Sequence, residues 1–133
     1  MKHASGTFEV KVTPTDASEV GKAGGIGRMT IEKVFSGALE GSSKGEMLTG
    51  GNHATGTLAY VAMETVTGRL EGRTGSFILR HDAWMMKSEP ATAHLDVSVV
   101  ASSGTGDLAG LTGRMTIERA EAMHSYVFEY ALD

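Results

Sequence analysis

The sequence contains no cysteine, only 2 prolines and no long apolar or basic run. Without cysteine the chain has no disulfides, no thiolate nucleophiles and no thiolate metal sites. Its apolar runs are too short for a transmembrane helix, and its first residues contain no apolar segment of signal-peptide length. We therefore expect a cytoplasmic protein without a membrane segment. The net charge of −4, without a basic tract, argues against nucleic acid as a partner.

Glycine is abundant, with 18 residues in a chain of 133. The glycines separate short segments in which apolar and polar residues alternate: 8–12, 29–35, 58–62, 95–99 and 126–132. A period of two is typical of a strand with one buried face. No segment of ten or more residues has a helical apolar stripe. The length fits one domain over residues 1–133 with one core.

Two repeats run through the chain. Residues 23–32 (AGGIGRMTIE) and 109–118 (AGLTGRMTIE) agree at all but two positions, and the pattern Thr/Ser-Gly-x-Leu-x-Gly recurs at 36–41, 67–72 and 105–110. Glycine permits a sharp bend, and the leucine would anchor that bend to the core. We predict an all-β fold, a closed antiparallel β-barrel of about eight strands. A two-sheet β-sandwich is the alternative.

Several motifs carry a family resemblance: GTFEVKVTP, GRMTIEKVFSGALEGSSKGEML, YVAMETVTGRLEGRTGSFIL and SGTGDLAGLTGRM. Together they span nearly the whole chain and resemble the bacterial domain-of-unknown-function 3224 family. The resemblance implies a small antiparallel barrel similar to that of allene oxide cyclase. It implies no established activity, because a shared fold does not specify function.

The sequence departs from this family pattern after GSFIL. The family usually has Gln-His-Ser-Gly-Thr-Met there, whereas this chain reads Arg80, His81, Asp82, Ala83, Trp84, Met85. The histidine and the methionine match, and the other residues do not. Val127 also lies where the family has a polar or acidic residue. The cluster of changes is compatible with natural divergence or with an engineered pocket.

Alternation assigns one face of each strand to the barrel interior. In GSFILRHDAWMM (75–86), that face carries His81 and Met85 among apolar side chains. The interior faces of the other strands add more polar and aromatic groups. The predicted pocket residues are Lys33, Tyr60, Glu64, His81, Met85, Tyr126 and Phe128, with His124 as a further candidate.

These interior groups are compatible with a catalytic role or with a purely structural one. Glu64 or His81 would act as a general base, and Tyr60, Tyr126 or Lys33 would stabilise a developing oxyanion. The reaction would then be proton abstraction, isomerisation or cyclisation of an apolar ligand without a cofactor. Alternatively, the lysine, glutamate and histidine form a buried network whose members only satisfy one another.

Asp82 and Trp84 form a second candidate site on the opposite face of the same strand. A carboxylate beside a large ring suits proton removal from a flat aromatic substrate, as in a Kemp-type elimination. Arg80 on that face would pair with Asp82 and weaken it as a base. A one-residue slip after Leu79 would turn these residues inward. Otherwise they belong to the outer wall, where Trp84 would mark a homodimer contact.

The five histidines, at 3, 53, 81, 94 and 124, lack metal-ligand spacing, so we expect no metal and no cofactor. The leading hypothesis is a barrel that binds an apolar or aromatic small molecule. One alternative is a cofactor-independent proton-transfer enzyme with Asp82, Glu64 or His81 as its base. Another is a structural module that forms a homodimer.

Overall fold

The computed structural model describes residues 1–120 and 123–132, and the side chains of all of these except 90–92 and 120. Its strands are β1 (Lys2–Thr15), β2 (Gly27–Gly37), β3 (Leu39–Asn52), β4 (Thr57–Leu70), β5 (Arg73–Met86), β6 (Glu89–Val99), β7 (Thr112–Ala120) and β8 (Met123–Ala131). A short helix, α1 (Glu19–Ala23), and a 3-10 turn, η1 (Gly106–Leu108), complete it. No helix in the described residues is long and apolar enough to cross a membrane.

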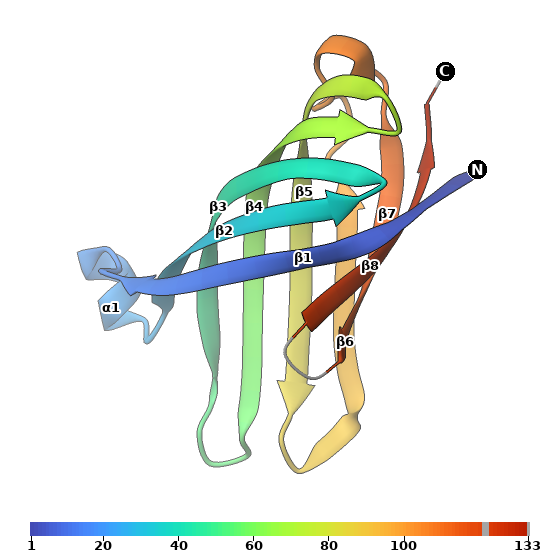
Figure 1. Ribbon diagram of the computed structural model, residues 1–133. Helices are drawn as coiled ribbons and strands as arrows, with labels where there is room; N and C mark the ends of the chain where they lie inside the picture. The colour runs from blue at the N-terminus through green and yellow to red at the C-terminus, as the bar shows by residue number, and fades with distance from the viewer. Residues whose placement is uncertain (121–122, 133) are drawn as a thin grey trace.

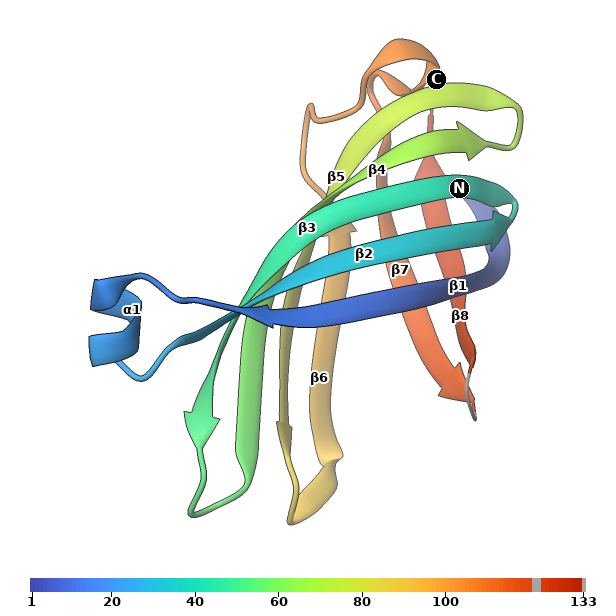
Figure 2. The same ribbon diagram turned by 60° about the vertical axis from the view of Figure 1, so that its left-hand side comes forward.

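The strands form a closed antiparallel barrel in the order β1 to β8 (Figures 1 and 2). Strand β1 closes it by pairing with β2 on one side and β8 on the other. The predicted eight-stranded barrel is therefore confirmed, and the sandwich alternative is wrong. Closing the sheet into a barrel leaves no strand with an unpaired edge, and this favours a barrel over an open sheet for these long alternating strands.

One seam of the barrel is weak. Within the described residues, β6 and β7 share a single residue pair, Ser98 with Arg114. Strands β4 and β5, in contrast, pair continuously from Leu70 with Arg73 to Thr57 with Met86. Beyond this pair, no backbone ladder joins the described residues of β6 and β7 in the barrel wall.

One end of the barrel, which we call the closed end, is packed with apolar side chains. The leucines of the repeated pattern, Leu39, Leu70 and Leu108, are all buried there, as the sequence predicts. Gly37 and Gly72 have φ of 105° and 91° at the adjacent bends, a region that side chains with a Cβ rarely adopt. The other end, the open end, is where the β3–β4 and β5–β6 hairpins extend beyond the barrel (Figure 1).

Candidate functional site

A cavity of about 310 Å³ lies inside the barrel towards the open end. Its apolar lining consists of Phe8, Val10, Val12, Ile31, Met47, Leu95 and Ile117, and its polar lining of Lys33, Tyr60, His81, Arg119 and His124. All eight strands contribute, because alternation turns one residue in two towards the axis. Val12 and Leu95 are each 44% exposed, which places them at the mouth of the cavity.

The floor of the cavity is a buried ionic triad from β2, β4 and β5. Lys33 Nζ lies 2.8 Å from Glu64 Oε2, and His81 Nε2 makes a short hydrogen bond to the same oxygen. The three residues are between 1% and 7% exposed. Glu64 Oε1 is buried and accepts no hydrogen bond from the described residues. The predicted convergence of these three side chains is therefore present.

The triad keeps Glu64 ionised. Burial alone would raise the pKa of this carboxyl. The hydrogen bond from His81 and the attraction of Lys33 and His81 outweigh that effect and lower the pKa to about 2. A carboxylate with so low a pKa is a weak base. Glu64 is therefore poorly suited to accept a proton from a molecule in the cavity.

Aromatic rings surround the lysine of the triad. The Nζ atom of Lys33 lies 4.7 Å from the centre of the Phe8 ring and 5.9 Å from that of Phe35. The face of an aromatic ring attracts a cation, more strongly where water is excluded. These rings and Glu64 together compensate the buried charge of Lys33, which is 6% exposed.

The upper part of the cavity carries a second polar group. His124 stacks on Phe8 with 5.0 Å between the ring centres, and it lies opposite Arg119 in the β7–β8 register. Burial, followed by the positive charges of Arg119 and Lys33, lowers the pKa of His124. Burial and the negative charge of Glu64 raise the pKa of Tyr60, whose side chain also faces the cavity.

Besides Glu64, which lies behind Lys33 and His81, three of the predicted pocket residues do not line this cavity. Tyr126 and Phe128 face inward but belong to the packed core of the closed end. The Tyr126 hydroxyl accepts a hydrogen bond from Leu39 N–H (2.9 Å) and donates one to the Ser36 carbonyl (3.0 Å). Met85 is 39% exposed, at the register shift between β5 and β6. Tyr126 and Phe128 thus support the closed end, and Met85 lies outside the cavity.

Asp82 and Trp84 lie on the outer wall, so the slip that would have turned them inward does not occur. Trp84 is 40% exposed and stacks on His94, with 6.2 Å between the ring centres. Asp82 Oδ2 lies 3.7 Å from His94 Nε2. Asp82 is therefore separated by the sheet from the cavity and from the triad.

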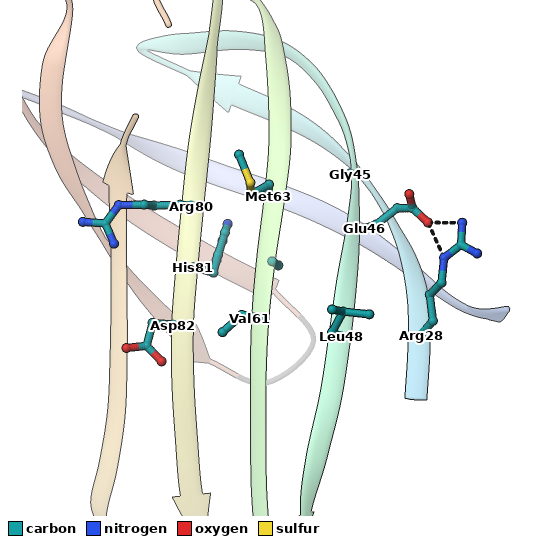
Figure 3. A pocket seen from close by; sticks show the side chains of 10 residues that line it. Arg28, Gly45, Glu46, Leu48, Val61, Met63, Arg80, His81 and Asp82 are labelled. Carbon is teal, nitrogen blue, oxygen red and sulfur yellow. Dashed lines mark hydrogen bonds and ion pairs between the residues drawn. The ribbon is translucent and has the colours of Figure 1, made fainter. Parts of the chain in front are cut away.

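A second hollow of about 850 Å³ lies mainly on the outer face of β3, β4 and β5 (Figure 3). Arg28 and Glu46 form an ion pair at one edge, and Arg80 and Asp82 lie at the other. Its apolar members, Leu48, Val61 and Met63, are 48–54% exposed. A hollow whose walls are half exposed buries less of a ligand than the interior cavity does.

Sequence reasoning missed Arg119 as a lining residue, together with much of the apolar wall. The signal was available, because Arg119 continues the inward alternation of Met115 and Ile117 on β7. As for metals, no group of three or more His, Asp or Glu side chains in the described part of the chain lies close enough to hold an ion.

Comparisons with known proteins agree with the fold. The family model for proteins of unknown function (DUF3224) matches residues 4–130. The crystal structure of a protein with unknown function from the DUF3224 family of Shewanella oneidensis is similar throughout. It has 41% sequence identity, covers 100% of this chain and 98% of that one, and has a TM-score of 0.88. No curated protein matches. These likenesses specify a fold and leave the activity to be argued from the cavity.

Proposed function

The chain belongs to the DUF3224 family of proteins of unknown function, and we propose that it is a β-barrel that binds an apolar or aromatic small molecule inside its open end. The walled cavity of about 310 Å³ above a buried polar triad is the observation that supports this most. Small-molecule sites in proteins are concave, mostly apolar and equipped with a few fixed polar groups, with volumes of about 300–1,000 Å³. The cavity has all of these features.

Calorimetric titration with uncharged apolar probes tests this proposal. We would use naphthamide, indole and octanol, and we expect saturable binding of at least one. Ile117→Trp should fill the cavity and weaken that binding about tenfold or more, whereas Val61→Trp on the outer wall should leave it unchanged. The smaller substitution Val10→Phe repeats the test if Ile117→Trp does not fold.

Two results would overturn the proposal. One is that none of the probes binds saturably. The other is that binding survives both cavity-filling variants but is lost in Val61→Trp, since Val61 lines the outer hollow instead.

Proton transfer is a second candidate function, favoured by the contact of His81 with Glu64 at the cavity floor. In it, His81 accepts the proton and Glu64 orients and stabilises the resulting imidazolium. Asp82 has no part in this scheme, because it lies on the outer wall. With nitrobenzisoxazole as a general-base probe, His81→Gln should abolish the protein-dependent rate and Asp82→Asn should retain it. An equal rate in wild type and His81→Gln would contradict this role.

The remaining sequence predictions concern the oligomeric state and the location of the protein. A homodimer formed through the outer face around Trp84 and a cytoplasmic location stay predictions. The likeness to allene oxide cyclase is a fold-level analogy and contributes nothing to the choice of ligand.

A further inference from the structure

The polar lining of the cavity consists of groups that can donate a hydrogen bond. They are Lys33, Tyr60, His81, Arg119 and His124. None of the described lining residues is a carboxylate. The nearest one, Glu64, is held by Lys33 and His81 at the floor. A ligand in this cavity therefore meets donors and positive charge, and these favour a ligand that offers an acceptor or an anion.

Arg119 and His124 bring two such donors together at the open end. They are directly opposite each other on β7 and β8. Side chains in opposite positions of an antiparallel pair have Cβ atoms about 4.5–5.5 Å apart, so one small headgroup can contact both. Arg119 is exposed, and none of the ion pairs between described residues involves it. A guanidinium in this situation can bind a carboxylate through two parallel hydrogen bonds.

The pair adjoins the apolar wall of the cavity. Val10, Ile117 and Leu95 lie along the wall, and Leu95 and Ile117 belong to the two strands that share a single residue pair. At the floor, Glu64 already neutralises Lys33 and would repel a second carboxylate. An anionic headgroup is thus better placed at Arg119, with the apolar part of the ligand against the wall.

We propose that the ligand of this cavity is an apolar monocarboxylate whose headgroup binds between Arg119 and His124. This inference rests on the proposed small-molecule function and specifies its ligand class. The apolar body lies against Val10, Leu95 and Ile117, and the ring of His124 is held in place by its stacking on Phe8.

Binding of the anion should be coupled to a proton. The positive charges of Arg119 and Lys33 act on His124 and contribute to its lowered pKa. A bound carboxylate offsets those charges and stabilises the imidazolium, so it raises the pKa of His124. The other titratable side chains that line the cavity are Tyr60 and His81. Affinity for the carboxylate should therefore increase as the pH falls below about 6.5, the ordinary histidine value, because the pKa of His124 in the free protein is lower than this.

A matched pair of probes tests the ligand class. Naphthoate and naphthamide have nearly the same shape, and only the first is charged at neutral pH. In wild type we expect naphthoate to bind about tenfold more tightly, as hydrogen bonds to a charged group allow. Arg119→Met should abolish that preference, because it removes the guanidinium that distinguishes the two headgroups. Arg80→Met, which removes an arginine from the outer wall, is the control and should change neither affinity.

The outcomes separate this inference from the proposed function. If naphthamide and naphthoate bind equally, or if the preference for naphthoate survives Arg119→Met, the cavity binds ligands but the carboxylate inference is wrong. If none of the probes binds, the proposed function itself fails. Histidine-resolved NMR titration gives a second readout: naphthoate should raise the pKa of His124, and naphthamide should not. An unchanged His124 titration with bound naphthoate would contradict the placement of the headgroup.

Discussion

The two ends of the barrel are built from the same eight strands but are filled differently. At the closed end, Leu39, Leu70 and Leu108 are at most 2% exposed and pack with aromatic rings. At the open end, the inward positions hold an ionic triad, a cavity and exposed residues such as Leu95. The closed end is filled by apolar packing. The open end contains a cavity and buried charged side chains, which packing alone would not retain.

This comparison indicates which part of the barrel stabilises the fold and which part serves a ligand. Removing buried apolar surface from water stabilises the folded state, and the closed end contains the largest buried side chains. Burying Lys33 and Glu64 together carries a desolvation cost that their attraction only partly offsets. A pair of this kind at a cavity floor is consistent with a site maintained for function.

The largest expected effect is at the floor of the open end. Glu64→Leu should lower the free energy of unfolding by about 3–5 kcal/mol, because it leaves the Lys33 cation buried without its partner. Denaturant unfolding measures this change. The double variant Lys33→Met/Glu64→Leu removes both charges and should recover most of the loss. A single variant as stable as wild type would show that the ion pair contributes little.

A matched pair of leucines compares packing at the two ends directly. Leu108→Ala should cost about 2–5 kcal/mol, since it leaves a void in a filled core. Leu95→Ala should cost less than about 1 kcal/mol, because Leu95 is 44% exposed at the cavity mouth. Thermal and denaturant unfolding of the two variants give the comparison. Equal losses at both ends would contradict the division between a packed end and an open end.

The pH dependence of stability should reveal the Glu64 carboxylate. Its pKa is lowered to about 2 in the folded protein from an ordinary value of 4.5, so the unfolded chain takes up the proton first as the pH falls. The stabilisation is fully present above pH 4.5 and is lost progressively as the pH approaches 2. At about 1.4 kcal/mol for each pKa unit, the loss is at most about 3–4 kcal/mol.

Glu64→Gln is the reference variant for that pH experiment, because it keeps the shape and removes the ionisation. The difference in stability between wild type and Glu64→Gln should shrink from pH 5 to pH 3. Other carboxyl groups contribute equally to both proteins, so they cancel. A difference that does not vary over this range would mean that Glu64 has an ordinary pKa.

The smallest effects are expected on the outer wall. Trp84→Ala removes a half-exposed ring that stacks on His94, and it should change the free energy of unfolding by about 1 kcal/mol or less. Because the sheet separates Trp84 from the cavity, naphthamide affinity should stay the same. Size-exclusion chromatography of the same variant tests the predicted homodimer. A shift from dimer to monomer would place the subunit contact at Trp84.

Alternation in the sequence predicted which side chains face inward but not how deep they lie. It correctly paired Lys33, Glu64 and His81 as interior residues, and it gave Tyr126 and Phe128 the same inward face. Depth along the barrel depends on the stagger between neighbouring strands. That stagger places Tyr126 and Phe128 in the closed end, and a single sequence contains no direct signal for it.

The residues around Trp84 show a related limit. The alternating pattern placed Asp82 and Trp84 outside, and a register slip after Leu79 was the alternative. The structure keeps the pairing continuous as far as Trp84, opposite His94, and the irregularity comes only between Trp84 and Met86. Local sequence cannot locate such a bulge, because it depends on how two strands of unequal length are joined.

The most direct test uses the methionine methyl groups in an NMR titration with naphthamide. Met47 lines the interior cavity and Met63 lines the outer hollow, so each reports on one of the two candidate sites in a single sample. The predicted result is a saturable shift of the Met47 methyl signal while Met63 stays in place. A shift of Met63 alone would place the ligand on the outer wall and contradict a binding site inside the open end.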